Sequence, residues 1–290
     1  MGILIGLLTA LTWGGADFTA RFSTHRIGTL RTMFYMQFIG FLLLTISMRW
    51  LGGWGHLADG SGWQPWAWGF LAGLLNSCGT LSLYRSFEIG KMAVVAPLSA
   101  SYPALTLTLS WLGGDYLSPA RVVGILFILF GVAVVAGGEH VPSESSAKPK
   151  RTNTRGIGWA CLAAVAFGVL FWLLGIRVVP RVGAVQAVWM IRLTSSLLTA
   201  SIMFFAAQPM RLPRGSVRWM AFGMGAFDTL AFVLSNRGMQ MEHVAVISVL
   251  GSLYGAVTVG LAAIFLHEHI SRWQWAGIAT IFGGIFLIGR

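Results

Sequence analysis

Charged residues are scarce in this chain of 290 residues, at 10% of the sequence against about 25% in an ordinary soluble domain. So few charges cannot cover the surface of a water-soluble globule, which excludes the usual soluble classes. Acidic residues are the rarest, with 9 Asp and Glu against 20 Lys and Arg and a net charge of +11. The basic residues lie mostly between apolar runs, so anionic lipid headgroups rather than nucleic acid are the expected partner.

Cysteine and catalytic motifs are nearly absent as well. Cys78 and Cys161 both lie within apolar runs, so no disulfide framework is expected. The phosphate-binding pattern Gly-x-x-x-x-Gly-Lys-Ser/Thr does not occur, which argues against direct ATP hydrolysis. The run His267-Glu268-His269 lacks the spacing of a metalloprotease helix. We therefore predict no catalytic residue, metal site or cofactor, and expect that the protein is not an enzyme.

Apolar residues dominate what is present. They make up 56% of the chain, and the mean hydropathy is +0.74. Runs of about 18 residues or more, long enough to cross a bilayer as a helix, recur along the sequence. We predict an all-α polytopic membrane protein with ten transmembrane helices. The predicted spans are 3–20, 32–48, 65–86, 92–112, 119–136, 156–176, 185–207, 217–235, 244–266 and 272–288.

The chain also contains an internal duplication. Tyr102 and Tyr254 occupy equivalent places in two similar stretches, and Asn76 corresponds to Asp228 at the same offset. The predicted domains are a first five-helix repeat at 1–138, a polar linker at 139–155 and a second five-helix repeat at 156–290. An odd number of spans per repeat makes the second repeat enter the membrane from the opposite face, so we predict two inverted repeats.

Inverted repeats of this kind place a binding site near the bilayer midplane, where helices are interrupted. Pro97 and Pro103 favour a kink in the fourth span, and Gly251 and Gly255 loosen the ninth. Close packing of small residues is an alternative explanation for these two glycines. The predicted substrate-lining residues are Trp13, Asn76, Ser99, Tyr102, Pro103, Trp172, Asp228, Ser252 and Tyr254.

Three ionisable residues lie inside predicted spans, where a charge is costly and indicates a function. Asp17, Asp228 and Arg192 are therefore candidates for coupling transport to protons. Arg192 and Asp228 lie at similar depth in antiparallel spans, so an ion pair is feasible, either purely structural or opening during transport. Asp17 lies one helical turn before Arg21, and an ordinary i,i+4 ion pair is the alternative to a coupling role.

Taken together, these features resemble the EamA family of the drug/metabolite transporter superfamily. The resemblance covers both halves and rests on Leu11-Thr-Trp13-Gly-Gly, residues 93–103, and Asp115-Tyr-Leu-Ser118 with Gly124 and Gly131. It implies a ten-helix inverted-repeat carrier with a central cavity. It also implies traffic in small metabolites, commonly amino acids or related compounds, and often outward. Val249 stands in the place of Pro97, so the second half departs from the pattern there.

The leading functional hypothesis is a proton-coupled secondary active exporter that works by alternating access in the bacterial inner membrane. Its expected partners are a small-molecule substrate, the lipid bilayer and protons, and its expected assembly is a monomer or homodimer. An intramembrane enzyme acting on lipid or isoprenoid substrates and a passive channel are the alternatives. Basic residues concentrate in the loops after odd-numbered spans, which predicts both termini outside, whereas the resemblance implies cytoplasmic termini.

Overall fold

The computed structural model describes residues 2–114, 118–137, 155–241, 244–267 and 270–288, and these residues form helices and turns without strands. Six helical segments are long and apolar enough to cross a bilayer: Thr29–Leu51, Met92–Leu112, Ile157–Val182, Ala184–Phe205, Ser216–Met241 and Ile247–Phe265. Two shorter apolar helices, Pro119–Gly131 and Trp275–Leu287, join them. The helices are those of an integral membrane protein. Asp115, Glu268, His269 and the predicted linker up to residue 154 lie outside the described residues.

The first half begins with two long helices that are joined at Gly28, whose φ of 82° favours glycine. Its elements are α1 (Gly2–Ile27), α2 (Thr29–Leu51), the 3-10 turn η1 (Gly55–Leu57), α3 (Gln64–Ile89), α4 (Met92–Ser99), α5 (Tyr102–Leu112) and α6 (Pro119–Gly137).

The second half also consists of helices joined by short turns. Its elements are α7 (Ile157–Leu173), the π turn η2 (Leu174–Val178), α8 (Val179–Val182), α9 (Ala184–Phe205), α10 (Ser216–Met241), α11 (Val244–Ser252), α12 (Tyr254–Phe265) and α13 (Arg272–Ile288). The first helical segment of this half continues to Val182, beyond the end predicted at residue 176. The wider π turn, closed by the bond from Val179 N–H to Leu174 O, admits Pro180 without ending the segment.

The fourth and ninth predicted spans are interrupted, as the sequence predicted. Helix α4 ends at Ser99, and α5 begins at Tyr102 with Pro103 in its first turn. Helix α11 ends before α12 begins at Tyr254. The two interruptions lie against each other, because a Cβ added at Gly255 would lie 2.7 Å from Ala100 Cβ. Glycine is therefore needed there for close packing.

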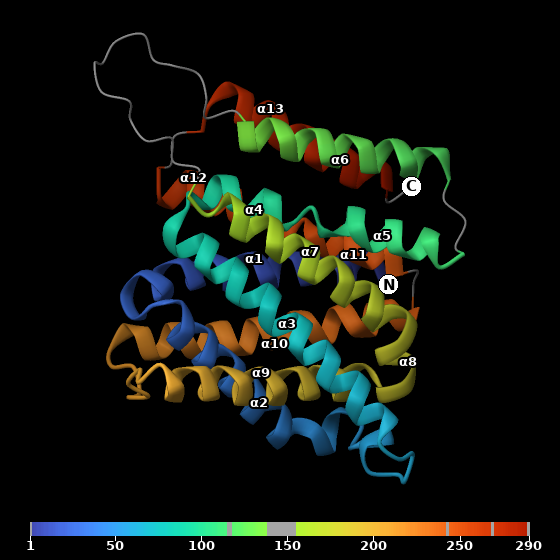
Figure 1. Cartoon of the computed structure of the whole chain (residues 1–290), viewed down its shortest axis with the longest axis vertical. Coiled ribbons are helices and arrows are strands. Elements are labelled where there is room, and N and C mark those ends of the chain that lie inside the picture. The colour runs from blue at the N-terminus through green and yellow to red at the C-terminus, as the bar shows by residue number, and fades with distance from the viewer. Residues whose placement is uncertain (1, 115–117, 138–154, 242–243, 268–269, 289–290) are drawn as a thin grey trace.

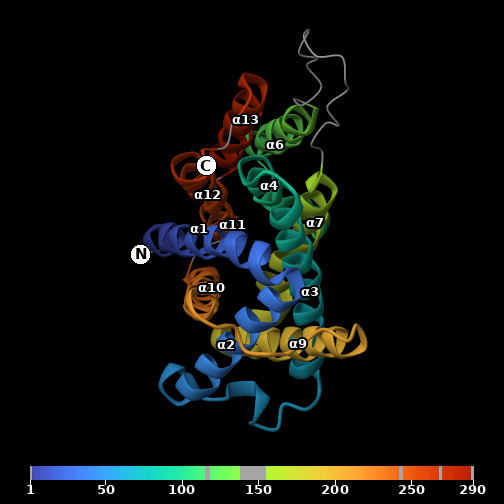
Figure 2. The same ribbon diagram turned by 90° about the vertical axis from the view of Figure 1, so that its left-hand side faces the viewer.

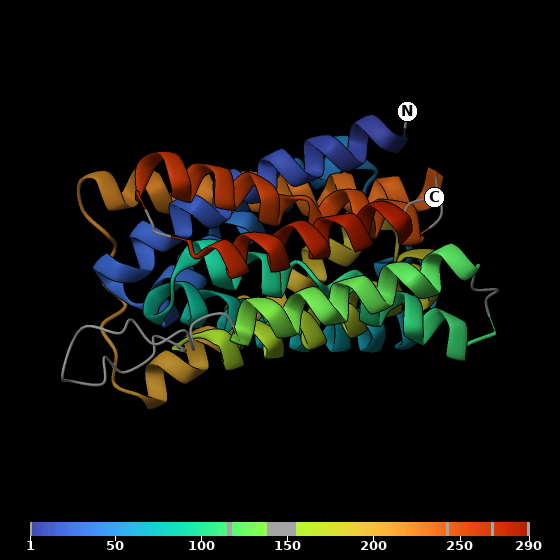
Figure 3. The same cartoon turned by 90° about the horizontal axis from the view of Figure 1, so that it is seen from above.

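Two pairs of helices close the ends of the molecule. Helices α6 and α13 lie side by side at one end of the long axis, and α2 and α9 lie toward the other (Figure 1, Figure 2). The start of α1 and the end of α13 lie at the same end of the helices (Figure 3).

The crossing of α6 and α13 is antiparallel and looks the same from either helix. A Cβ at Gly131 would lie 2.7 Å from Gly277 O, and a Cβ at Gly284 would lie 2.5 Å from Gly124 O. The two backbones thus approach each other closely where neither residue carries a side chain.

Helices α2 and α9 are antiparallel as well. Tyr35, near the start of α2, donates to Arg211 O beyond the end of α9 at 2.6 Å. Gln186, near the start of α9, donates to Gly53 O beyond the end of α2 at 2.7 Å. The two halves of the chain are therefore joined at both ends of this pair.

Candidate functional site

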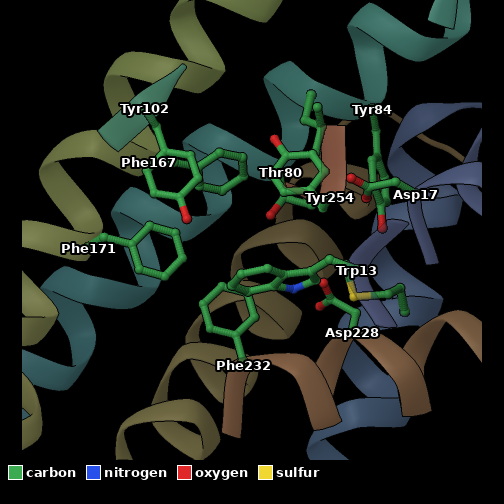
Figure 4. A pocket seen from close by; sticks show the side chains of 12 residues that line it. Trp13, Asp17, Thr80, Tyr84, Tyr102, Phe167, Phe171, Asp228, Phe232 and Tyr254 are labelled. Atoms are coloured by element: carbon green, nitrogen blue, oxygen red, sulfur yellow. The ribbon is translucent and has the colours of Figure 1, made fainter. Parts of the chain in front are cut away.

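A cavity lies between the two halves of the chain, and the empty space in and around it, open solvent included, amounts to about 410 Å³. Its walls come from α1, α2, α3 and α5 in the first half and from α7, α10 and α12 in the second. The lining residues are Trp13, Asp17, Met36, Thr80, Leu83, Tyr84, Tyr102, Phe167, Phe171, Asp228, Phe232 and Tyr254 (Figure 4). A ligand held here would contact both halves.

Aromatic rings form much of the wall and touch one another across the cavity. Trp13 meets Phe171, Phe232 and Tyr254 edge to face, with ring centroids 5.7, 5.2 and 6.2 Å away. Tyr102 stacks on Phe171 at 4.8 Å. These distances are those of favourable ring pairs. Because the rings already touch, a metabolite-sized ligand requires them to separate.

The two matched tyrosines tie the interrupted helices of one half to those of the other. The Tyr102 hydroxyl donates to Ser248 O of α11 at 3.0 Å. The hydroxyls of Tyr254 and Ser99, at the end of α4, lie 3.0 Å apart and share a hydrogen bond. Each tyrosine begins the second part of one interrupted helix and bonds to the first part of the other.

The predicted ion pair between α9 and α10 is present beside the cavity. Arg192 Nη2 donates to Asp228 Oδ2, and Nη1 donates to Gln37 Oε1 of α2 at 2.5 Å. The guanidinium also lies over the Phe232 ring, 5.1 Å from its centroid. Arg192 is fully buried, so Asp228 meets the cavity as a carboxylate whose charge is balanced from behind.

Asp17 meets the cavity from α1 without such a partner. It is 5% exposed, and among the described residues its carboxylate has neither a hydrogen bond nor an ion pair. Arg21 does not form the i,i+4 pair, because its guanidinium donates instead to the carbonyl oxygens of Phe87 and Gly90 at the end of α3. Figure 4 places Asp17 beside Tyr84 at the cavity wall.

Five of the predicted substrate-lining residues do not line the cavity. They are Asn76, Ser99, Pro103, Trp172 and Ser252. Asn76 is buried with Nδ2 3.2 Å from Ser195 Oγ, and its Oδ1 has no partner among the described residues. The Ser252 hydroxyl bonds to Val249 O of its own helix at 2.8 Å. Pro103 is buried in the first turn of α5, and Trp172 is half-buried on α7, where it packs against the apolar core.

Seven lining residues were not predicted from the sequence: Met36, Thr80, Leu83, Tyr84, Phe167, Phe171 and Phe232. Helical spacing links several of them to predicted residues. Phe232 follows Asp228 by four positions, and Thr80 follows Asn76 by four. Because residues four apart share one face of a helix, each predicted residue also marks its neighbour one turn away. No group of three or more His, Cys, Asp or Glu side chains able to hold a metal ion occurs in the described part of the chain.

Comparison with known proteins adds a family and a fold. The model of the family described as "EamA-like transporter family" matches residues 1–137 and 154–290. No curated protein gives a significant match. A solved structure described only as "Crystal structure of protein" is similar over 99% of this chain and 95% of its own, with a TM-score of 0.71 and 22% identity. At 22% identity, this similarity shows that the two proteins share a fold.

Proposed function

Because this chain belongs to the EamA-like transporter family, a family of membrane transporters in the drug/metabolite transporter superfamily, we propose that it is a secondary active carrier. Its cargo is small organic metabolites, such as amino acids or related compounds, which it moves outward across the bacterial inner membrane. The observation that carries this proposal is the cavity between the two halves, where the interrupted helices meet. Sites of secondary transporters lie in such places.

The carrier consists of two inverted five-helix repeats at 1–138 and 156–290, joined by a linker at 139–155. Antiparallel packing supports the inversion, because α2 and α9, or α6 and α13, would run in the same direction if the second copy were inserted like the first. The ten spans include α1 and α3, which have 26 residues each and are long enough to cross a bilayer. Their polar residues, such as Asp17 and Asn76, are buried in the protein.

Hydrogen bonds that join the halves at both ends support alternating access. At one end, Arg26 bonds to Ser216 Oγ at 2.8 Å. At the other, Gln186 and Arg237 bond to carbonyl oxygens beyond or at the end of α2, at 2.7 and 3.2 Å. Such bonds contribute about 0.5–1.5 kcal/mol each. When the carrier opens toward one face of the membrane, the hydrogen bonds at that end break and those at the other end remain. The cost of the broken hydrogen bonds is therefore small.

Proton coupling is assigned to Asp17. Asp228 already has Arg192 as its counterion, whereas the Asp17 carboxylate has no counterion among the described residues to balance its charge. A buried charge requires compensation. When the cavity holds no cargo, a proton bound to Asp17 neutralises this charge.

Counterflow in proteoliposomes tests the carrier. Labelled amino acids and related amines, loaded at saturating concentration, should exchange across the membrane, and a proton gradient should drive their accumulation. Asp17→Asn should lose the response of accumulation to the proton gradient. Glu88→Gln removes a carboxylate outside the cavity and should behave like the wild type. Absence of saturable flux for every solute in the panel would contradict a carrier, and linear flux without counterflow would indicate a pore.

The membrane orientation requires its own measurement. We propose cytoplasmic termini, as in the family, against the distribution of basic residues. A reporter fused after Arg290, active only in the cytoplasm, distinguishes the two orientations. A fusion protein that is expressed but inactive would contradict the proposal.

A further inference from the structure

The charges around the cavity do not cancel. Two carboxylates, Asp17 and Asp228, belong to its wall, and no Lys, Arg or His lies among the described residues that line it. Arg192 lies behind Asp228, with one nitrogen on Asp228 and another on Gln37. Asp17 therefore remains as one buried carboxylate with no counterion among the described residues.

The two sides of the cavity correspond to each other in the proposed repeat. A Cβ at Gly14 of α1 would lie 2.5 Å from Val257 Cγ1, and a Cβ at Gly168 of α7 would lie 2.8 Å from Leu105 Cβ. Leu105 and Val257 each follow the matched tyrosine of their half by three residues. Gly14 and Gly168 therefore make equivalent contacts, and α1 corresponds to α7.

This correspondence pairs Asp17 with Phe171, since each follows its glycine by three residues. One copy thus places a carboxylate on the cavity wall where the other places an aromatic ring. Phe171 is stacked on Tyr102 and meets Trp13 edge on. A carboxylate opposite a group of aromatic rings is the arrangement that holds an ammonium ion, because both the negative charge and the ring faces attract a cation.

We propose that the cavity selects organic cations, namely small amines or quaternary ammonium compounds with an apolar body. The ammonium nitrogen binds Asp17, and the apolar body lies between the rings of Trp13, Phe171 and Phe232. This inference rests on the proposed carrier function and narrows the cargo from amino acids to the related amines. An amino acid would bring a carboxylate to a wall that already carries two, and the Arg192 guanidinium behind Asp228 is already held by two partners. An anion would face Asp17 directly.

Three probes have the same phenyl ring and differ in charge: 2-phenylethylamine is a cation, L-phenylalanine a zwitterion and phenylacetate an anion. Each is titrated into the purified full-length protein in detergent, and binding is followed by calorimetry and by the rise in Tm. We expect 2-phenylethylamine to bind at least about tenfold more tightly than the zwitterion or the anion. Equal or tighter binding of L-phenylalanine or phenylacetate overturns the proposal, and so does an amine that fails to bind at about 10 mM.

Variants at Asp17 test whether its carboxylate binds the ammonium group. Asp17→Asn should weaken 2-phenylethylamine at least about tenfold, Asp17→Glu should retain part of the binding, and Glu88→Gln should match the wild type. Unchanged amine binding in Asp17→Asn overturns the proposal. Tm without ligand is measured for each variant, and if Asp17→Asn does not fold, the three-probe comparison on the wild type decides alone.

Flux measurements distinguish a failure of cation selectivity from a failure of the carrier proposal. Saturable exchange of L-phenylalanine that is unchanged by Asp17→Asn would refute cation selectivity and leave the carrier standing. Selective binding of 2-phenylethylamine without saturable flux of any probe would refute the carrier and leave a cation-binding cavity.

Discussion

Arg192 of α9 and Asp228 of α10 form an ion pair beside the cavity, and the Arg192 side chain is 0% exposed. The same guanidinium donates to Gln37 Oε1 of α2, so one charge joins three helices from both halves. A substrate that separates the aromatic rings must therefore move past a group that is fixed from two sides.

Removing one partner of this pair should destabilise the protein strongly. Arg192→Met or Asp228→Asn leaves the other group buried without its partner, which costs about 3–5 kcal/mol. The free energy of unfolding, followed as Tm in detergent, should fall accordingly. The double variant Arg192→Met with Asp228→Leu leaves no buried charge and should recover most of the loss.

The pair formed by Arg85 and Glu88 is the matched control. Its N–O distance is 2.7 Å, but its side chains are 44% and 24% exposed. Arg85→Met should cost less than about 1 kcal/mol. A fall in Tm as large as that of Arg192→Met would show that burial is not what makes the Arg192 pair important.

The ion pair and the interrupted helices could be predicted because both follow from local chemistry. The rise of about 1.5 Å per residue fixes how deep Arg192 and Asp228 lie in antiparallel helices. Proline at position 103 is tolerated in the first turn of a helix but disfavoured in its interior, so it favours a new helix start at that point. Neither inference requires knowledge of how the helices are rotated about their axes.

The aromatic wall could not be predicted, because it depends on that rotation. Helix α7 is apolar on every side, so the sequence contains no sign of which face meets the cavity. Phe171 and Trp172 are neighbours and point about 100° apart on the helix. The structure places Phe171 on the cavity and Trp172 away from it. On α1 and α10 the polar residues Asp17 and Asp228 mark the inner face.

Glycine at the crossing of α6 and α13 should be essential for packing. Gly131→Ala and Gly284→Ala each place a Cβ within 2.7 Å of a backbone carbonyl oxygen, so the helices must move apart at a cost of about 1–3 kcal/mol. Gly283→Ala is the control, because nothing lies within 4 Å of its Cβ position. It should be neutral or slightly stabilising. Equal Tm for the three variants would contradict the observed close approach.

Double-mutant cycles should show that the two hydrogen bonds at the helix interruptions contribute independently to stability. Ser99→Ala and Tyr254→Phe remove the same bond, so their effects of about 1 kcal/mol each should not add. Tyr102→Phe removes a different bond, to Ser248 O, and should add to Ser99→Ala. Thermal unfolding of the three single variants and the two double variants tests this. Additivity between Ser99→Ala and Tyr254→Phe would contradict the shared bond.

The loop between α2 and α3 contains a carboxylate with a predictable titration. The Ser61 hydroxyl, the Ser61 backbone N–H at 2.9 Å and His56 Nδ1 at 2.7 Å all contact Asp59, and these hydrogen bonds, the hydroxyl first, lower the Asp59 pKa to about 2. The depressed pKa means that the contacts stabilise the loop above the ordinary value of 3.8 and lose this effect as the pH falls toward 2.

Carboxyl NMR titration measures this shift. Ser61→Ala should raise the Asp59 pKa toward 3.8, because the largest cause of the shift is removed. Ser201→Ala is the control, since that hydroxyl bonds to Leu197 O of its own helix. An Asp59 pKa that does not change in Ser61→Ala would contradict the role of the hydroxyl.

Packing at two other glycines identifies which residues of α2 and α9 correspond. A Cβ at Gly73 would collide with Thr194 Cβ, and a Cβ at Gly225 would lie 2.8 Å from Ile39 Cβ. Gly73 and Gly225 occupy matched positions on α3 and α10, at the same offset as the matched tyrosines. Thr194 of α9 therefore takes the place that Ile39 takes on α2.

Arg192 precedes Thr194 by two residues, as Gln37 precedes Ile39, and Asp228 is matched by Asn76. The ion pair of the second half thus corresponds to a pair of uncharged amides in the first. If the inverted repeat is correct, an ion pair should be equally stable at the matched positions of either half. Asn76→Asp alone places an unpaired carboxylate at a site that is 0% exposed and should lower Tm strongly.

Moving the whole ion pair to the first half should reverse that loss. In the quadruple variant Gln37→Arg, Asn76→Asp, Arg192→Gln and Asp228→Asn, the guanidinium lies on α2 and the carboxylate on α3, in the arrangement that α9 and α10 have now. Its Tm should lie well above that of Asn76→Asp, because the buried carboxylate regains a counterion. A quadruple variant no more stable than Asn76→Asp would mean that the two halves do not share this geometry, and the inverted repeat would then lack its most direct energetic support.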